Sequence, residues 1–353
     1  MLDLPPLARF GDRLATGLLD VTSDPAALDS KGFWAVCADF EGRLTCARFA
    51  HVRTEPVPAP RPGAWRGPVV GDWTSSLDRA AYTAGVRRVR AHIAAGEVYQ
   101  ANLCRVLSAP VGPDADVDAL TALLARGNPA PYAGTIRLPG HGVEIATASP
   151  ELFLRRSGRT VESGPIKGTG RTEDDLLEKD YAENVMIVDL VRNDLGRVCA
   201  TGTVTVPDLC AVEKHPGLVH LVSAVRGELS ADAGWPELLD AAFPPGSVTG
   251  APKSSALRII DVLETAPRGP YCGGVGWVDA DRGTGELAVG IRTFWIDRAA
   301  DGAARLRFGT GAGITWGSDP EGEWRETELK ASRLLAIASG AYEANGTGEA
   351  LAT

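Results

Sequence analysis

The sequence predicts an α+β fold with antiparallel sheets. Segments with strand periodicity and segments with helix periodicity are mixed along the chain, without the strict βαβ alternation of a doubly wound parallel sheet. The 353 residues, 44% of them apolar, suffice for one large domain or two merged domains. A chain of this length buries roughly 75% of the surface that its unfolded form exposes, so its core needs neither a metal nor a disulfide.

The N-terminal part is predicted to contain a strand, a stiff connection and a helix. Residues 32–40 form an apolar run before a turn, which is typical of a strand. Five prolines within 54–68 predict an extended connection that lacks backbone donors. A helix is expected over 77–95, with Gly96 after its end, because apolar residues recur at helical spacing at Tyr82, Val86, Val89 and Ile93.

A strand predicted over 97–108 has two faces of different polarity. One face carries four apolar residues, Tyr99, Ala101, Leu103 and Leu107. The other face carries Gln100, Asn102 and Cys104. Two neighbouring amides indicate either a solvent-exposed face or the lining of a polar site, and both interpretations stay open at this point.

The same periodicities predict the remaining elements. Helices are expected over 173–193, 252–264 and 320–339, the last with Asp319 as its N-cap. Glycine-rich and β-branched segments predict strands within 133–156, 272–297 and 304–316. From Tyr342 onward the residues are small and polar, which predicts a disordered tail.

Charge and composition exclude several classes of protein. The formal net charge of -9 argues against a nucleic-acid binder, which usually carries a basic field. No apolar run approaches ~20 residues, so no membrane span is expected, and the first residues do not resemble a signal peptide. The cysteines show no CxxC pair, which favours free thiols in a reducing cytoplasm: Cys37, Cys46, Cys104, Cys199, Cys210 and Cys272.

Two pairs of carboxylates stand one helical turn apart. Asp180 and Glu183 share one predicted helix, and Glu323 and Glu326 share another, on which Lys330 follows Glu326 by one turn. Like charges at this spacing destabilise a helix unless a cation offsets them. Mg²⁺ prefers a few carboxylates together with water and an anionic substrate, so it is one candidate. Two solvated helix faces are the alternative.

Single residues in turn-rich segments are candidates for acid–base or covalent chemistry. Lys167, between glycine and proline in 163–169, could be an activated nucleophile or an ordinary surface lysine. Glu151 could be a general acid or a charge at a strand end. His220 lies in an apolar run and reads as a core residue. The turn at 250–253 opens a helix and favours an anion, but its spacing is not that of a phosphate-binding loop.

Together these segments resemble the chorismate-binding enzyme family. The matching blocks follow the order of the family over about residues 75–340. They are VYQANL (98–103), ASPELF (148–153), GPIKGT (164–169), ENVMIVDLVRNDLGR (183–197), HLVS (220–223), FPPGSVTGAPK (243–253), IRT (291–293), GAGI (311–314) and EWRETELK (323–330).

The resemblance implies the architecture of anthranilate synthase component I. Two antiparallel β-sheets pack as a sandwich with flanking helices, and the site lies in the cleft between them. Residues 1–70 are then a shortened N-terminal segment that contributes to the first sheet, 71–340 the chorismate-binding catalytic domain, and 341–353 the tail. The short N-terminal region implies that the tryptophan-binding segment of longer members is reduced.

Within the family, the resemblance is closest to the aminodeoxychorismate synthase component I group. Members that add water carry a lysine base where this chain has Gln100, so ammonia is the expected nucleophile. The group reads Pro-Ile-Lys-Gly-Thr, as here at Lys167, where anthranilate synthases read Pro-Ile-Ala-Gly-Thr. The implied roles are covalent attack by Lys167 and protonation of the departing hydroxyl by Glu151. Gly164 stands where the family often has an arginine before Pro-Ile, a departure that could loosen the loop of Lys167.

The resemblance also implies the ligands. Glu183 and Glu326 would hold Mg²⁺ with Asp180 and Glu323 in support. Chorismate would be bound by Arg292, Lys330, Gly311, Ala312, Gly313, Thr169, His220, Tyr271 and Thr249.

The chain shows no glutaminase motif, so a separate glutamine amidotransferase subunit is implied, with a downstream aminodeoxychorismate lyase. Alternatives are anthranilate synthase component I, a synthase forming 2-amino-2-deoxyisochorismate, isochorismate or salicylate, and a non-catalytic chorismate-binding regulatory subunit.

Overall fold

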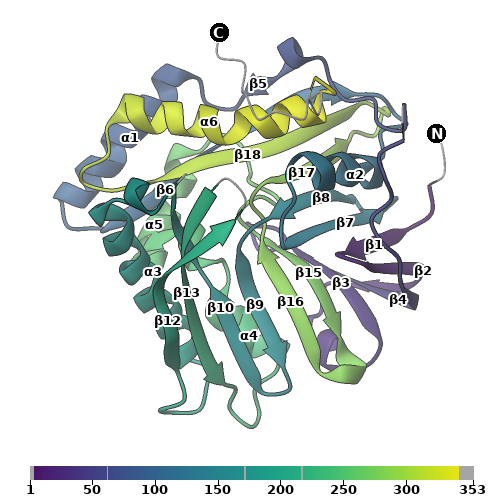
Figure 1. Ribbon diagram of the computed structural model, residues 1–353, viewed down its shortest axis with the longest axis horizontal. Coiled ribbons are helices and arrows are strands. Elements are labelled where there is room, and N and C mark those ends of the chain that lie inside the picture. The colour runs from purple at the N-terminus through teal and green to yellow at the C-terminus, as the bar shows by residue number, and fades with distance from the viewer. Residues whose placement is uncertain (1–3, 62, 171, 216–217, 342–353) are drawn as a thin grey trace.

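The computed structural model describes residues 4–61, 63–170, 172–215 and 218–341. Figure 1 shows strands that curve around a common interior, with helices on their outer side. Tyr342 and the rest of the predicted tail lie outside the described residues.

The first nine strands come from residues 7 to 157. They are β1 (Leu7–Phe10), β2 (Arg13–Thr22), β3 (Phe33–Ala38), β4 (Leu44–Thr54), β5 (Thr74–Ser75), β6 (Gln100–Val111), β7 (Tyr132–Leu138), β8 (Val143–Ser149) and β9 (Leu152–Ser157). The other nine are β10 (Thr160–Gly164), β11 (Ile166–Gly170), β12 (Thr205–His215), β13 (Leu218–Glu228), β14 (Gly250–Ala251), β15 (Gly274–Asp279), β16 (Thr284–Val289), β17 (Thr293–Arg298) and β18 (Ala304–Ile314).

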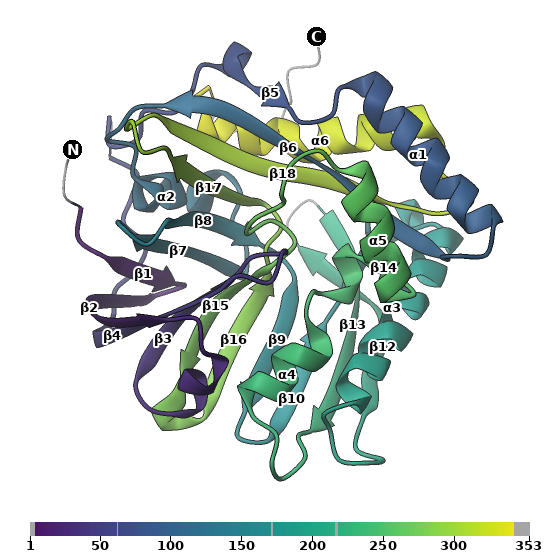
Figure 2. The same ribbon diagram turned by 180° about the vertical axis from the view of Figure 1, so that it is seen from behind.

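The helices cover the outer faces of these strands (Figures 1 and 2). They are α1 (Arg79–Ala94), α2 (Val117–Gly127), α3 (Glu178–Gly196), α4 (Trp235–Ala242), α5 (Lys253–Leu263) and α6 (Pro320–Ala338). Helices α1 and α6 pack together against β6 and β18, α2 packs on β7 and β8, and α3 packs on β11, β12 and β13. Two short 3-10 turns, η3 (Glu173–Asp175) and η4 (Gly246–Val248), precede α3 and β14.

Strand pairing confirms the α+β class and the antiparallel sheets. The hydrogen-bonded order is β12-β13-β10-β9-β16-β15-β3-β4-β2-β1-β7-β8-β17-β18-β6, and every pair in it is antiparallel. Strand β11 also pairs with β13, and β5 and β14 pair with β6. The two expected sheets are therefore two halves of one folded sheet, which the N-terminal strands β1 to β4 connect.

A large apolar core fills the interior of the fold. It combines residues of both halves of the sheet with α3 and α4, among them Trp34, Phe49, Ile145, Leu154 and Trp235, each at most 3% exposed. Smaller clusters lie beneath α2 and α6 and beneath α1 and α5. Packing on this scale fixes the strands that carry the polar residues described below.

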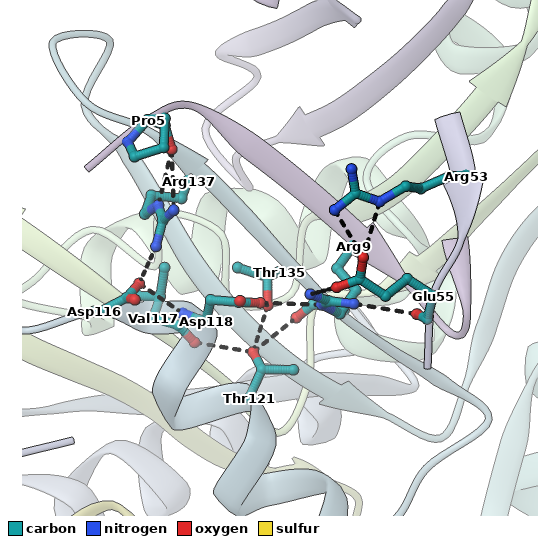
Figure 3. Close-up of polar contacts among 11 residues, drawn as sticks. Pro5, Arg9, Arg53, Glu55, Asp116, Val117, Asp118, Thr121, Thr135 and Arg137 are labelled. Carbon is teal, nitrogen blue, oxygen red and sulfur yellow. Dashed lines mark hydrogen bonds and ion pairs between the residues drawn. The ribbon is translucent and has the colours of Figure 1, made fainter. Parts of the chain in front are cut away.

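Figure 3 shows a polar network that fastens β1 to the start of α2 and to β7. Arg9 of β1 donates to Asp118 at 3.2 Å and to the carbonyl of Glu55 at 3.2 Å. Arg137 of β7 donates to Asp116, the N-cap of α2, at 2.6 Å. Both arginines are at most 5% exposed, so these partners satisfy charges that burial would otherwise make costly.

Helix α6 begins and ends as its sequence predicts. The carboxylate of Asp319 accepts a hydrogen bond from the backbone N–H of Gly322 at 2.7 Å, and Pro320 occupies the first turn. Its buried residues follow helical spacing at Thr327, Ala331, Leu334 and Ile337. The predicted helices over 77–95 and 252–264 are confirmed as α1 and α5.

Three local expectations are wrong. The helix predicted over 173–193 begins at Glu178, because 173–175 form the separate turn η3 and Leu177 is extended. Tyr99 precedes β6 and is 73% exposed, so it does not join the apolar face. Lys167 lies in a strand, β11, and not in a turn as expected for 163–169, since it pairs with Leu221 of β13.

All six cysteines are free thiols. No helix in the described part of the chain is both long and apolar enough to cross a membrane.

The carboxylate of Glu264 and the guanidinium of Arg268 form a buried ion pair at 2.6 Å, 8% and 1% exposed. Glu264 also accepts from the backbone N–H of Cys104 in β6, and Arg268 donates to the carbonyls of Asn102 and Val248. The pair thus ties β6 to η4. Sequence reasoning missed this ion pair. Its signal in the sequence is a pair of opposite charges four residues apart at the end of a predicted helix.

Glu264→Ala should lower the free energy of unfolding by about 3–5 kcal/mol, because it leaves the Arg268 charge buried without its partner. Urea denaturation measures this change. Glu321→Ala is the matched control: it breaks the exposed Arg79–Glu321 pair and should cost less than about 1 kcal/mol. Equal small effects of the two substitutions would contradict the expectation.

Candidate active site

The candidate residues gather where the two ends of the folded sheet approach each other. The connection from Pro245 to Ala251 bridges these ends. On one side the carbonyl of Thr249 accepts from the N–H of Asn102 in β6 at 2.8 Å. On the other side the carbonyl of Ser247 accepts from the Nζ of Lys167 in β11 at 2.9 Å. Residues that are distant in sequence thereby form one site.

Glu151 is a buried carboxyl group between β8 and β9. It is 4% exposed, and its side chain is hydrogen-bonded to Ser247 and to the backbone N–H of Ile166. Burial raises its pKa to about 7, although Ser247, the nearby Lys167 charge and the N–H of Ile166 oppose the shift. A carboxyl group with this pKa is partly protonated at neutral pH and can act as a general acid.

Lys167 is held at a bulge between β11 and β13. Gly168 follows with a φ of +79°, and a Cβ there would come within 2.9 Å of the Cβ of Asp180. Only glycine therefore allows α3 to approach the bulge this closely. The Lys167 ammonium also interacts with the carboxylates of Glu183 and Glu326, so it lies at the centre of the charged groups.

Glu183 of α3 and Glu326 of α6 interact with each other from two different helices. Burial raises the pKa of Glu183, and the neighbouring charges of Asp180 and Glu326 add to the shift. Burial also opposes ionisation of Glu326, but the charges of Lys330, Lys179 and Lys167 together outweigh it and lower the pKa of Glu326. The Nζ of Lys330 lies 2.7 Å from the Oε1 of Glu326. This half-buried pair of carboxylates would be stabilised by a cation.

The other two predicted metal ligands have local partners. Asp180 accepts a hydrogen bond from the N–H of Leu177 at 2.9 Å and so caps α3. Glu323 is hydrogen-bonded to Ser318, and burial raises its pKa. Among the residues that the structure describes, no group of three or more Asp, Glu, His or Cys side chains is arranged to hold a metal ion. The geometry thus offers Glu183 and Glu326 as a two-carboxylate set.

Arg292 is a cation without a counter-charge among the residues that the structure describes. Within the described ranges its guanidinium has no hydrogen bond or ion pair, and burial lowers its pKa. Its φ of +51° is unusual for an arginine and places it just before β17. An unpaired, half-buried guanidinium is well suited to bind a carboxylate.

Strand β18 supplies a flat, glycine-rich surface opposite β6. Gly311 faces Cys104 and Gly313 faces Asn102 in this ladder, and the carbonyl of Gly311 accepts from Lys330 at 3.2 Å. Ala312 points the other way, into the core beneath α1 and α5.

Gln100 and Asn102 line the polar face of β6, as the sequence suggested. They are buried, at 0% and 8% exposed. A Cβ on Gly313 would lie 2.1 Å from the Nε2 of Gln100 and 3.1 Å from the Oδ1 of Asn102. The solvent-exposed interpretation of this face is therefore wrong.

The remaining predicted binding residues lie around this centre. His220 is buried in β13, opposite Glu213. The hydroxyl of Thr249 is bonded to carbonyls of its own turn at 3.2 Å. Tyr271 is buried, its hydroxyl 3.8 Å from the Sγ of Cys104. The side chain of Thr169 lies outside the described part of the structure. Sequence reasoning missed Ser247, whose carbonyl and hydroxyl join Lys167 and Glu151.

A small cavity of about 20 Å³ lies beside Glu151 and Ser247 and extends to Asp194. It has room for about one water molecule.

Comparison with known proteins adds the following. A family model described as chorismate binding enzyme matches residues 37–336. The chain is 42% identical over 275 residues to anthranilate synthase component 1 of Streptomyces coelicolor, covering 74% of this chain and 52% of that protein. It is 43% identical over 266 residues to an aminodeoxychorismate synthase of Streptomyces pristinaespiralis, covering 71% of this chain and 35% of that protein. The chain thus spans about half, or less, of the length of these relatives.

The fold also has solved counterparts. Anthranilate synthase component I from Streptococcus pneumoniae superposes with a TM-score of 0.74 at 23% identity, covering 94% of this chain and 90% of that one. This likeness supports the fold that the sequence predicted.

Proposed function

Because this chain belongs to the chorismate binding enzyme family, we propose that it is an aminodeoxychorismate synthase component I. It would convert chorismate and ammonia to 4-amino-4-deoxychorismate. The observation that carries this proposal is the placement of Lys167, whose Nζ is held 2.9 Å from the carbonyl of Ser247, while the hydroxyl of the same serine is bonded to Glu151. A nucleophile and a general acid are thus fixed by one residue.

The substrate carries two carboxylates, and the site offers cations for them. Arg292 would bind one in its bidentate fork, since no described residue occupies its guanidinium. Lys330 and the backbone of Gly311 and Gly313 would contact the substrate from the side of β18.

Glu183 and Glu326 fit a hard divalent cation. They are carboxylates of α3 and α6 whose charges interact. Burial raises the pKa of Glu183, and the neighbouring carboxylates of Asp180 and Glu326 raise it further. Mg²⁺ commonly takes one or two carboxylates and completes its coordination with water and substrate oxygens. A bound Mg²⁺ would supply positive charge that holds a substrate carboxylate.

The reaction would consist of two displacements. The Lys167 ammonium would first release one proton to the solvent. The lone pair of the resulting amine then forms a bond to C2, the ring double bonds shift, and the C4–O bond breaks. Glu151 gives its proton to the departing oxygen, which leaves as water. Ammonia then forms a bond to C4, and the C2–N bond breaks, which returns the electron pair to Lys167. The new amine passes its surplus proton to Glu151, which restores the acid for the next turnover. Chorismate and ammonia become 4-amino-4-deoxychorismate and water.

We further propose that the ammonia comes from a separate glutamine amidotransferase subunit, that a lyase consumes the product, and that the enzyme works in the cytoplasm. Free ammonium should replace the amidotransferase in vitro.

The runner-up is anthranilate synthase component I, which is favoured by the 42% identity to the Streptomyces coelicolor protein. Its amine would be at C2. A non-catalytic chorismate-binding subunit is disfavoured because Glu151, Lys167, Glu183 and Glu326 occur together.

Mass spectrometry of the products tests the proposal. The purified chain is incubated with chorismate, Mg²⁺ and ammonium, with and without an added aminodeoxychorismate lyase. The expected result is 4-aminobenzoate only in the tube that contains the lyase, and no product after EDTA has removed the metal. Anthranilate, isochorismate or salicylate would overturn the assignment within the family, and no turnover would favour the regulatory alternative.

A further inference from the structure

Arg105 of β6 is a buried arginine that contacts the N-terminal half of α6. It is 2% exposed. Its Nε donates to the hydroxyl of Thr327 at 3.0 Å, its Nη2 donates to the carboxylate of Glu328, and its guanidinium lies 4.1 Å from the centroid of the Trp324 ring. Its Nη1 donates to the hydroxyl of Ser75 in β5 at 3.1 Å. Because each nitrogen has its own partner, the planar guanidinium is fixed in one orientation against residues 324–328.

Thr327 is the residue through which this part of α6 is bonded to the sheet. Helix α6 lies along β18 (Figures 1 and 2). Arg105 is directly opposite Thr310 of β18 in the strand ladder, and the hydroxyl of Thr310 donates to the carbonyl of Thr327 at 3.0 Å. Paired residues of two adjacent strands therefore bond the hydroxyl and the carbonyl of one helix residue. A buried network of satisfied polar groups holds a helix rigidly.

The apolar core holds mainly the other half of the helix. The buried apolar residues of α6 all belong to its C-terminal half: Ala331, Leu334, Ile337 and Ala338. Within 320–330, a fully described range, Thr327 is the only buried residue. Trp324 is half-buried and packs edge-on against Tyr82 of α1. The rotation of the N-terminal half about the helix axis thus depends on Trp324 and Thr327, and Arg105 contacts both.

This half of α6 also carries a carboxylate of the candidate cation site. Glu326 directly precedes Thr327, and successive residues of a helix point about 100° apart. A rotation of α6 would therefore turn Glu326 away from Glu183, its charged neighbour on α3. Because the two carboxylates come from separate helices, each helix must be fixed independently for the pair to form.

We propose that Arg105 is a positioning residue for the divalent cation of this site, which sets the rotation of α6 so that Glu326 faces Glu183. This inference rests on the proposed binding of Mg²⁺ by these two carboxylates. The charge of Arg105 alone would act in the opposite direction, because a nearby cation repels a metal ion. Loss of positioning should weaken metal binding, whereas loss of the charge alone should strengthen it.

Titration of the purified chain with Mn²⁺ alone, followed by electron paramagnetic resonance of the free ion, tests the proposal. Mn²⁺ takes the same carboxylate and water ligands as Mg²⁺. Arg105→Met should raise the Kd for Mn²⁺ by about 10-fold or more, the effect of replacing a residue that orients metal ligands. The Mg²⁺ concentration for half-maximal activity should rise in parallel, and activity should recover at saturating Mg²⁺. Arg105→Lys keeps the charge but not the planar fork, so its Kd should also rise.

Arg105→Met should fold, because its charged partner Glu328 is 56% exposed and can be solvated. Thr327→Val provides a second measurement if it does not. This variant removes the hydroxyl that Arg105 bonds, leaves the charge of Arg105 in place, and should raise the Kd in the same direction. Arg79→Met is the matched control. It breaks the exposed Arg79–Glu321 pair on the same helix without touching 324–328, and it should leave the Kd within about 2-fold.

An unchanged or lowered Kd in Arg105→Met would overturn the positioning role, even if the variant were less stable to urea. A wild-type Kd in Arg105→Lys would also overturn it, since charge alone would then suffice. The wild type distinguishes these failures from those of the proposed function. If it binds neither Mn²⁺ nor Mg²⁺, with or without chorismate, the metal site and this inference both fail. A 2-amino product overturns only the C4 assignment, and a raised Kd in Arg105→Met still supports the positioning role.

Discussion

Lys167→Ala is expected to abolish formation of 4-amino-4-deoxychorismate. The substitution removes the amine that would form the bond to C2, and it leaves Glu151 and the carboxylate-binding cations in place. Removing a group of this kind lowers rates by about two orders of magnitude or more. Liquid chromatography with mass spectrometry of reactions with chorismate, Mg²⁺ and ammonium measures the loss.

The effect should be specific to this lysine. Lys214→Ala is the matched control, because Lys214 lies on β12, is 74% exposed and pairs with Glu173. It should keep the wild-type rate. Intact-protein mass spectrometry during turnover should show an adduct on the wild type and none on Lys167→Ala. A variant that still forms the 4-amino product at an undiminished rate would rule out the covalent route.

Glu151→Gln is expected to lower turnover by about 10²- to 10⁴-fold, the range for a lost general acid. The pH profile of the wild type should follow the same group. Its pKa is raised to about 7 by burial, so the protonated acid is depleted as the pH rises through about 7. The rate of the chemical step should therefore fall above this pH, and the pH–rate profile of Glu151→Gln should not show this decrease. Glu321→Gln, at an exposed carboxylate, is the control.

The same substitution should make the protein more stable at high pH. The folded state binds the Glu151 proton more tightly than the unfolded state, because the pKa is about 7 against an ordinary value of 4.5. This contribution is complete below pH 4.5 and is lost as the pH rises through about 7. Relative to Glu151→Gln, the wild type should lose on the order of 3 kcal/mol between these limits. Urea denaturation at pH 4.5 and 8 measures the difference, and a parallel pH dependence would contradict it.

Much of the fold was predictable because its signals are local. The spacing of apolar residues located α1 and α6, and Asp319 with Pro320 marked the start of α6. Alternation along β6 placed Gln100 and Asn102 on one face and Ala101 and Leu103 on the other. These patterns reflect backbone periodicity, which does not depend on distant parts of the chain.

The expectations that failed depend on neighbours far away in sequence. Residues 173–177 have helical composition, but 173–175 form a separate turn and Leu177 is extended before α3 begins. The segment of Lys167 has the glycines of a loop, but its pairing with β13 makes it a strand. In each case contacts with other elements outweigh local preference, as tertiary context commonly does.

The sequence by itself determined which residue types could do chemistry: two carboxylate pairs, Lys167, Glu151 and the amides of β6. The tertiary structure alone decided which of them meet and what they can do. Only folding brings Ser247 between Lys167 and Glu151, and only folding buries Glu151 so that its pKa rises to about 7. Only folding also leaves the side-chain amide of Gln100 and the Oδ1 of Asn102 without a hydrogen-bond partner among the described residues. The physical reason is that burial and hydrogen bonding, which set protonation and affinity, are properties of the surroundings in space and are not encoded by spacing along the chain.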